Sequence, residues 1–416
     1  MEVLHIATAG SVDDGKSTLI GRLLYDTRSV PQDKLDAIEQ TSKRKGLDFV
    51  DLSLLTDGLI AEREQGITID VAHIYFSTPT RKYIIADTPG HVEYTRNMVT
   101  GASNAQVSVI LIDARNGVVE QTYRHFYIAA LLRIPHLVVC INKMDLVQFD
   151  QARYNQIVED FQQVIARTHF QIQDIRFIPV SSLQGENVVT ASHKMPWYKG
   201  PSLLEFLENI QVDNAIQNLP ARFPVQYVVR PKKDAYHDYR GYAGKVASGS
   251  FRQGDEVTVL PTLQKSRIQS IEKFTEKLSE ANARESVTLV LEDDIDISRG
   301  NMLVRSGELP PQQKDFQATI CWLSHQPLSA GKTYLLQHGV QLVKAKIAQL
   351  NNLVNVETWE TETNISSIQL NGIGSVQIKT AKPIFADAYI ENPANGAFIL
   401  IDEHSNSTVG VGFVAS

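Results

Sequence analysis

The sequence predicts an α/β domain, with a mostly parallel sheet and helices on both faces, followed by two all-β barrel domains. Up to about residue 211, short apolar runs alternate with amphipathic stretches, a pattern typical of a parallel sheet covered by helices. After that point the segments are short, rich in Val, Thr and Gly, and separated by turns, as in small β barrels. A chain of 416 residues also exceeds what one hydrophobic core usually organises.

The first predicted domain spans residues 1–211. Its continuous apolar runs indicate strands that are buried on both faces. These runs are Leu4–Ala9, Tyr83–Asp87, Val107–Asp113, His136–Asn142 and Phe177–Val180. Between them, Gln121–Leu132 and Ala152–Thr168 have the spacing of amphipathic helices.

The two β domains are predicted at residues 222–308 and 312–416. A linker at Val212–Ala221 and a Gly- and Pro-containing break at Gly307–Pro311 delimit them. Their expected strands are Pro224–Arg230, Gly241–Ser248, Asp255–Leu260, Ser286–Leu291, Gln317–Trp322, Lys332–His338, Gln341–Leu350, Ser375–Ile378 and Gly396–Asp402.

Composition excludes several classes of protein. The chain is 43% apolar and 21% charged, with a formal net charge of -7, which argues against a nucleic-acid-coating protein. Its two cysteines form no disulfide or metal framework. No apolar run approaches the roughly 20 residues of a membrane span, and the N-terminus does not resemble a signal peptide. We therefore expect a soluble cytoplasmic protein without a membrane or nucleic-acid partner.

The strongest motif is a phosphate-binding loop. Residues 10–17 match G-x-x-x-x-G-K-[ST], after an apolar strand and before the helical pattern Ser17–Leu24. Glycines let the backbone approach phosphates, whose charge then lies at the positive end of a helix. Lys16 is expected to bridge the β- and γ-phosphates. The expected phosphate-site residues are Gly10, Ser11, Val12, Asp13, Asp14, Gly15, Lys16, Ser17 and Thr18.

A magnesium site is expected beside this loop, with Ser17, Thr68 and Asp87 as its residues. Asp87 ends an apolar strand in the sequence Asp-Thr-Pro-Gly, and Gly90 can offer a backbone N–H to the γ-phosphate. Thr68 lies in the charged stretch Glu62–Ile69. This stretch is either a switch that closes on Mg²⁺ when the γ-phosphate is present or simply a charged surface loop.

The nucleotide base that the site recognises is predicted from the segment Asn142-Lys143-Met144-Asp145, which again lies at the end of an expected strand. One carboxylate, Asp145, can accept hydrogen bonds from both the N1–H and the N2 amino group of guanine. Adenine would leave that carboxylate unpaired. Asn142 is expected to tie the loops together, and the Lys143 stem to lie over the base. After the strand Phe177–Val180, the residues Ser181, Ser182 and Leu183 supply a backbone N–H for the guanine oxygen.

Taken together, these motifs resemble those of the translation-factor GTPases. Further matching segments are Arg63–Thr68, Asp87–His91 and Arg96–Met98. The resemblance implies a GTPase domain followed by two β barrels. It also implies that His91 positions the attacking water, so that the catalytic set is His91, Lys16 and Thr68. In that family Val12 and Ile67 would form an apolar gate that restrains His91 until a partner triggers hydrolysis.

Within this group the chain is most similar to the large GTPase subunit of bacterial sulfate adenylyltransferase. Ser11 and Asp14 stand where translation factors usually have histidine. The segments that carry the narrower resemblance are residues 10–26, Asp57–Glu64, Arg222–Val228, Arg240–Gly244 and Asp296–Gly300. Nearly the whole chain is covered, including both β domains.

This resemblance implies a heterodimer with a small catalytic subunit that binds ATP and sulfate. That subunit would form adenosine 5′-phosphosulfate and pyrophosphate, and GTP hydrolysis on the large subunit would drive this uphill step. Some relatives carry a fused adenylylsulfate kinase, which makes that kinase a further candidate partner. This sequence contains no second phosphate loop after residue 17.

Two other functions remain open from the sequence. An elongation or release factor that delivers an RNA-linked cargo would need a basic face. The basic cluster Arg230–Lys233 is short and followed by Asp234, so it is either a solvated turn or a contact with the catalytic partner. The third alternative is a GTP-regulated binding switch without a coupled reaction. Asp13 either helps to bind a monovalent cation or braces the loop.

Overall fold

The computed structural model describes residues 3–44, 46–56, 71–88, 95–167, 174–211, 215–230, 239–274, 276–356 and 358–416. The chain divides into two compact units. The first contains Met1–Val212 with Val356–Trp359, and the second contains Asp213–Asn355 with Glu360–Ser416.

The first unit is built on a six-stranded sheet in the order β2-β3-β1-β4-β5-β6. Its strands are β1 (Val3–Ala9), β2 (Ala72–Ser77), β3 (Lys82–Asp87), β4 (Val107–Asp113), β5 (His136–Asn142) and β6 (Asp174–Pro179). Only the pairing of β2 with β3 is antiparallel; the other pairings are parallel. Every residue of β4 is buried, as a central strand covered on both faces requires. The predicted mostly parallel sheet is confirmed.

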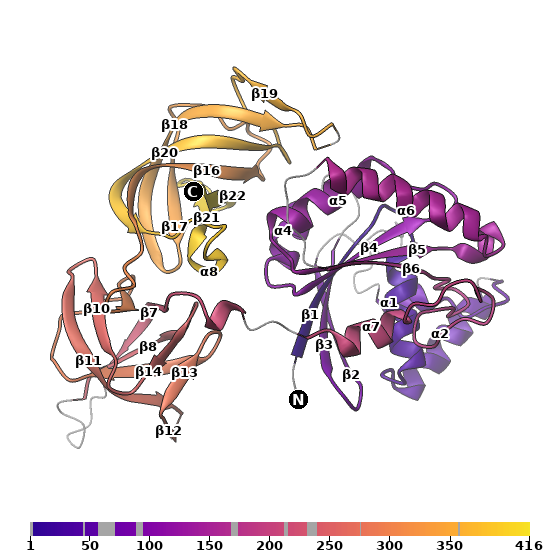
Figure 1. Ribbon diagram of the computed structural model, residues 1–416, viewed down its shortest axis with the longest axis horizontal. Coiled ribbons are helices and arrows are strands. Elements are labelled where there is room, and N and C mark those ends of the chain that lie inside the picture. The colour runs from indigo at the N-terminus through magenta and orange to yellow at the C-terminus, as the bar shows by residue number, and fades with distance from the viewer. Residues whose placement is uncertain are drawn as a thin grey trace. The chain divides into compact units, whose positions relative to one another are not determined.

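Helices cover both faces of this sheet. They are α1 (Lys16–Asp26), α2 (Gln32–Arg44), α4 (Thr95–Ala102), α5 (Glu120–Leu131), α6 (Gln151–Ala166) and α7 (Leu203–Asn209), with short 3-10 helices at Leu52–Leu55 and Met144–Val147. In Figure 1, α4, α5 and α6 lie on one side of the sheet, and α1, α2 and α7 lie on the other. Local sequence sets their starts. Asp150 caps α6, and Ser202 forms a capping box with Glu205 at the start of α7.

The second unit begins with a barrel of antiparallel strands. They are β7 (Arg222–Val229), β8 (Gly241–Lys245), β10 (Glu256–Leu260), β11 (Gln264–Lys273), β12 (Glu276–Leu278), β14 (Ser286–Leu291) and β15 (Met302–Arg305). Their order is β10-β15-β7-β8-β14-β11-β12, and the pairing of β10 with β11 closes the barrel. A separate small sheet joins β9 (Ser250–Arg252) and β13 (Glu280–Asn282). Apolar side chains that alternate along these strands fill the interior.

A second barrel follows in the same unit. Its strands are β16 (Gln312–Trp322), β17 (Thr333–His338), β18 (Gln341–Val354), β19 (Thr361–Thr363), β20 (Ile373–Phe385), β21 (Ala397–Ile401) and β22 (Thr408–Val414), with a short helix α8 (Pro393–Gly396). The order is β17-β21-β22-β16-β20-β18-β19, closed by the pairing of β17 with β18. The predicted pair of all-β barrels is therefore confirmed.

A buried ion pair joins the two barrels. The Arg222 guanidinium donates from Nε and Nη2 to the two carboxylate oxygens of Asp387, at 2.9 Å each. Asn392 and Asn395 donate to the same carboxylate at 3.2 and 2.8 Å. Both charges are almost fully buried, which is tolerated because each charged group is hydrogen-bonded to the other and to neighbouring polar groups.

In the part of the chain that the structure describes, no helix is long and apolar enough to cross a membrane.

Candidate nucleotide-binding site

The phosphate loop occupies residues 10–15, between β1 and α1. Gly15 precedes the helix with φ 94°, in the left-handed region that glycine adopts without strain. A Cβ atom there would lie 2.5 Å from Nδ2 of Asn142, so a larger residue would collide with the neighbouring loop. No side chain caps the start of α1. Its first N–H groups, with their partial positive charge, therefore face the loop.

Lys16 is the first residue of α1, and its side chain is buried. Its Nζ atom donates to the carbonyl oxygens of Gly10 and Ser11 at 2.8 and 3.2 Å. Burial lowers the pKa of this lysine, while the nearby charges of Asp87 and Asp14 raise it. The ammonium thus lies inside the loop, held by backbone oxygens. Ser17 and Thr18 follow it in the first turn.

Asp14 is a buried carboxylate within the same loop. It is 4% exposed, and its Oδ2 atom accepts the Ser11 N–H at 2.6 Å. Burial raises the pKa of Asp14 to about 6, against the opposing effects of the Ser11 N–H and the Lys16 charge. The loop therefore contains an acid whose charge is costly in this environment.

Asp87 lies at the end of β3, next to the phosphate loop strand. The Thr8 hydroxyl donates to Asp87 Oδ1 at 2.9 Å, and the Thr88 hydroxyl donates to the Thr8 carbonyl oxygen at 2.5 Å. The side chain of Asp87 is buried. Thr8 and Asp87 are paired in the parallel sheet, so Asp87 lies at the same sheet edge as the phosphate loop, where its charge acts to raise the pKa of Lys16.

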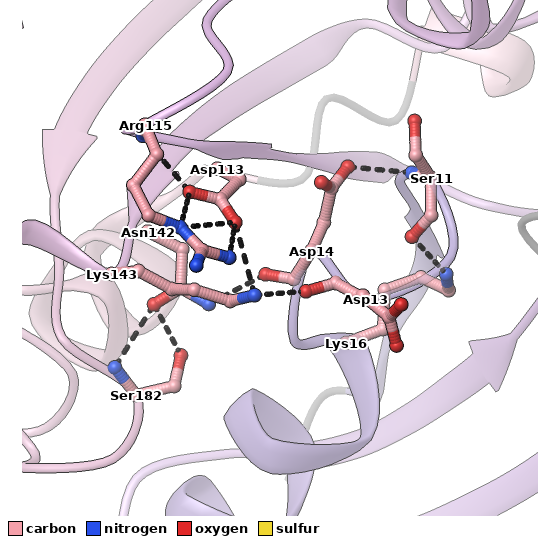
Figure 2. A network of polar contacts seen from close by, with 9 residues as sticks. All are labelled: Ser11, Asp13, Asp14, Lys16, Asp113, Arg115, Asn142, Lys143 and Ser182. Carbon is pink, nitrogen blue, oxygen red and sulfur yellow. Dashed lines mark hydrogen bonds and ion pairs between the residues drawn. The ribbon is translucent and has the colours of Figure 1, made fainter. Parts of the chain in front are cut away.

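Asn142 connects the phosphate loop to the loop after β6. Its Nδ2 atom donates to the Asp14 carbonyl oxygen at 2.7 Å. Its Oδ1 atom accepts both the backbone N–H and the hydroxyl of Ser182, at 3.0 and 2.9 Å. Figure 2 shows these contacts converging on one side chain. The expected role of Asn142 in tying the loops together matches this geometry.

Lys143 extends from the same loop along the phosphate loop. Its Nζ atom donates to the Asp13 carbonyl oxygen and lies 3.0 Å from Asp113 Oδ2. Arg115 contacts the same carboxylate at 2.6 Å, as Figure 2 shows. Burial acts to raise the pKa of Asp113, but the hydrogen bonds from Arg115 and Lys143 outweigh it and lower that pKa to about 2.

Asp145 is held by the loop that follows β6. The Ser181 hydroxyl donates to Asp145 Oδ1 at 2.5 Å, and Ser181 and Ser182 are both buried. Leu183 is 39% exposed. The side chain of Arg22 reaches this loop from α1, with Nε 3.1 Å from the Ser182 carbonyl oxygen.

The sequence reasoning missed two participants, Asp113 and Arg22. Asp113 had a usable signal, because it is the acidic end of an apolar strand that runs parallel to the strands ending at Asp87 and Asn142. No signal in the sequence points to Arg22, because its contact with Ser182 joins residues that are 160 positions apart.

Several predicted site residues lie outside the described residues. They are Ile67, Thr68, Gly90 and His91. Val12, the other residue of the expected gate, is 38% exposed. Among the residues that the structure does describe, no group of three or more His, Cys, Asp or Glu side chains forms a metal site.

The described residues form two recognition surfaces at the carboxyl edge of one sheet. The phosphate loop, the start of α1 and Lys16 suit an anionic ligand. The loops carrying Asp145 and Leu183 suit a ring with adjacent donors and an acceptor. Asn142 and Lys143 join the two surfaces. The arrangement therefore fits a nucleotide bound along the edge, in line with the usual ligand position in such sheets.

Comparison with known proteins gives the family. Residues 1–217 match the model described as elongation factor Tu GTP binding domain, and residues 315–415 match the GTP-eEF1A C-terminal domain-like model. Over 414 residues the chain is 49% identical to sulfate adenylyltransferase subunit 1 of Citrobacter koseri, with 99% of this chain and 86% of the relative covered. The chain belongs to the sulfate adenylyltransferase subunit 1 family.

Members of the family also occur within longer proteins. The chain is 49% identical over 413 residues to the bifunctional enzyme CysN/CysC of Mycobacterium tuberculosis (strain CDC 1551 / Oshkosh), with 99% of this chain and 67% of the relative covered. Among solved structures, that of sup35 complexed with GDP matches at 24% identity with a TM-score of 0.45, and covers 100% of this chain and 94% of that one.

The β-domain segments that pointed to the subunit 1 family have clear places in the fold. Arg222–Val228 lies on β7 and Gly241–Gly244 on β8. Arg222, at the start of the first segment, is the buried arginine that holds Asp387. In this member of the family, that segment therefore includes a contact between the barrels.

Proposed function

We propose that this chain binds GTP with Mg²⁺ and hydrolyses it as the large subunit of a sulfate adenylyltransferase. The observation that carries the proposal is the 49% identity to a subunit 1 across 99% of the chain. Both β barrels fall within that match, so the similarity extends well beyond the nucleotide motifs. An elongation-factor-like delivery of RNA-linked cargo is not favoured. In domain terms, we propose a GTPase domain at 1–211 and barrels at 222–308 and 312–416.

Phosphate binding is assigned to residues 10–18. On this proposal, triphosphate oxygens replace the carbonyl oxygens of Gly10 and Ser11 as partners of Lys16 Nζ, which is already directed into the loop. The uncapped start of α1 supports the same assignment. Asp13 braces the loop through its carbonyl contact with Lys143.

Guanine binding is assigned to Asn142, Lys143 and Asp145 with the loop at 181–183. Asp145 accepts two donors of the base, while Ser181 holds the carboxylate in place. Lys143 is fixed along the phosphate loop by Asp113, where its stem can cover the base.

Mg²⁺ binding is assigned to Ser17, Thr68 and Asp87. Two of these are described. Ser17 lies in the first turn of α1, and Asp87 is a buried carboxylate at the adjacent strand end. Such oxygen donors suit Mg²⁺, which usually keeps several waters and contacts phosphates directly. When bound, the ion neutralises phosphate charge.

Hydrolysis is assigned to water positioned by His91, with Val12 and Ile67 as the restraining gate. In this scheme Lys16 and Thr68 stabilise the charge that develops on the phosphates. Slow hydrolysis in isolation and stimulation by the partner follow from such a gate.

The partner is proposed to be a small catalytic subunit that joins ATP and sulfate into adenosine 5′-phosphosulfate and pyrophosphate. The designation of the relatives as subunit 1 supports the existence of a partner. GTP hydrolysis can drive this step only if the GTP- and GDP-bound states bind the partner differently. Adenylylsulfate kinase is a further candidate partner, supported by the name of the bifunctional relative. We propose a cytoplasmic location, which agrees with a sequence that contains two cysteines, both of them buried.

The test is a reconstituted reaction. The chain is mixed with a candidate small subunit, ATP, GTP and sulfate, and pyrophosphate release is measured. We expect GTP-dependent adenylylsulfate formation that is lost in Lys16→Ala and retained in Lys34→Ala, which removes an exposed lysine on α2. GTP-dependent binding of aminoacyl-tRNA with no effect on sulfate activation would refute the proposal.

A further inference from the structure

The side chain of Arg22 connects helix α1 to the loop that follows β6 through hydrogen bonds. From the second turn of α1, its Nε atom donates to the Ser182 carbonyl oxygen at 3.1 Å, and Nη2 donates to the Leu183 carbonyl oxygen at 2.5 Å. Nη1 contacts Asp26 Oδ1, one helical turn later, at 3.4 Å. The planar guanidinium thus uses a separate donor for each of three fixed partners.

These contacts fix the direction of one backbone N–H. The Ser182 carbonyl and the Leu183 N–H belong to the same planar trans peptide, in which C=O and N–H point in opposite directions. Because Arg22 holds the oxygen on the α1 side, the Leu183 N–H points away from α1. A charged donor on the carbonyl also strengthens the N–H as a donor.

The Leu183 N–H is the donor that this loop leaves available. The Ser182 N–H is bonded to Asn142 Oδ1, and the Gln184 N–H is bonded to the Ser181 hydroxyl. Ser181 and Gly185 donate their N–H groups to backbone carbonyl oxygens. In the part of the chain that the structure describes, the Leu183 N–H has no protein acceptor, and it belongs to the loop whose Ser181 hydroxyl holds Asp145.

We propose that Arg22 is a positioning residue for base recognition, which fixes the peptide between Ser182 and Leu183 so that the Leu183 N–H meets O6 of guanine. This inference rests on the proposed GTP binding. It also links the two ends of the site, because α1 carries Lys16 at its start and Arg22 further along. A shift of the phosphate-binding helix is thereby transmitted to the base-reading loop.

The surroundings of Arg22 allow its removal without loss of the fold. Its side chain lines an open hollow of about 650 Å³ that is shared with Tyr25, Arg28 and Gln184. Water can enter the space that a shortened side chain leaves, so no sealed apolar cavity forms. Arg28 lines the same hollow, and its side chain makes no hydrogen bond or ion pair with any residue that the structure describes. Arg28→Ala therefore matches Arg22→Ala in charge and location.

The experiment compares nucleotide affinities of the intact chain and its Arg22→Ala, Arg22→Lys and Arg28→Ala variants. The probes are GTP, ITP, ATP and 6-thio-GTP, whose sulfur accepts hydrogen bonds more weakly than oxygen. We expect Arg22→Ala to bind GTP about tenfold more weakly, as for one lost hydrogen bond. The same variant should also show a smaller preference for GTP over 6-thio-GTP, because the hydrogen bond to position 6 of the base is the one lost.

The preference for GTP over ITP, which reports the N2 contact of Asp145, should remain. Arg22→Lys should recover part of the loss because one ammonium can reach only one carbonyl well, and Arg28→Ala should behave like the wild type. If Arg22→Ala weakened the binding of GTP and 6-thio-GTP equally, or if Arg28→Ala showed the same loss, the role of Arg22 would be overturned. The proposed GTP binding would still stand in that case. If the wild type did not prefer GTP to ATP, the proposed function would fail and this inference with it.

Discussion

Lys143 Nζ and Asp113 Oδ2 lie 3.0 Å apart, and the carboxylate of this ion pair is 2% exposed. Asp113 ends β4 and Lys143 directly follows β5, so the pair joins two adjacent strand ends. The pair holds the lysine that also donates to the Asp13 carbonyl oxygen. Asp113 thereby fixes the base-reading loop against the phosphate loop.

Asp113→Asn should weaken binding of GTP and GDP alike, by about tenfold or more, because charge-assisted hydrogen bonds contribute more than neutral ones. The two nucleotides should be affected equally, since Lys143 is assigned to the base and not to the γ-phosphate. Titration with a fluorescent guanine nucleotide measures both affinities. Loss of GTP affinity with GDP affinity unchanged would contradict this role.

The same ion pair predicts a pH dependence of stability. Because hydrogen bonds from Arg115 and Lys143 lower the pKa of Asp113 to about 2, its contribution to stability is present above the ordinary aspartate pKa of 3.8. It is lost as the pH falls through about 2. The difference in unfolding free energy between wild type and Asp113→Asn should therefore be constant from pH 5 to 8 and shrink below pH 4. Denaturant unfolding at several pH values tests this.

Asp14 should show the opposite behaviour. Burial raises its pKa from 3.8 to about 6, so the stability associated with the protonated form is present below pH 4 and is lost as the pH rises through about 6. Asp14→Asn removes the charge but keeps an acceptor for the Ser11 N–H. In the nucleotide-free protein it should stabilise the fold above pH 6 by up to about 3 kcal/mol, and the gain should vanish near pH 4.

Asp14→Ala separates charge from hydrogen bonding. This variant loses the acceptor that the Ser11 N–H contacts at 2.6 Å, so it should gain less than Asp14→Asn at every pH. Both variants are compared with the wild type by denaturant unfolding without nucleotide. A destabilisation by Asp14→Asn that did not change with pH would show that the charge is not the cost we infer.

Much of this site could be predicted because parallel strands place their carboxyl ends at one edge. Residues 10–17, Asp87 and Asn142 each follow an apolar run, so their convergence follows from the sheet class alone. Apolar runs also located β4 and β5 to the residue. Strand β2 was not predicted, although four of its six residues are apolar; it lies at the edge of the sheet, and Phe76 is its one buried residue.

The side-chain contacts between distant segments could not be predicted. Arg22 and Ser182 are 160 positions apart, and Arg222 and Asp387 are 165 apart. The periodicity of apolar residues in the sequence indicates which face of a helix or strand is buried. It contains no information about which polar groups meet once the elements pack, because that depends on the three-dimensional placement of both.

The Arg222–Asp387 pair predicts a large mutational cost. Asp387→Ala leaves the buried guanidinium with its contacts to the Ala221 and Glu308 carbonyl oxygens but without a counter-charge. We expect a loss of about 3–5 kcal/mol in unfolding free energy. Lys379→Ala, which removes an exposed ion pair with Asp315 at 3.1 Å, should change stability by about 1 kcal/mol or less. Urea unfolding followed by circular dichroism measures the unfolding free energy of both variants. Equal losses in the two variants would contradict the inference that the buried Arg222 charge depends on Asp387.

Asp145→Asn should change which base is accepted. The Ser181 hydroxyl holds one oxygen of the carboxylate at 2.5 Å, so the group has a fixed orientation toward the ligand. Guanine offers two donors to it, whereas xanthine has an acceptor in place of the N2 amino group. An amide supplies one acceptor and one donor, so the variant should bind GTP about a hundredfold more weakly and prefer XTP. Competition between GTP and XTP for the nucleotide-free protein measures the change.

Ser181→Ala serves as the control because it frees the Asp145 carboxylate without altering its charge. This variant should weaken GTP binding without creating a preference for XTP. Retained selectivity for GTP in Asp145→Asn would mean that another group reads the base.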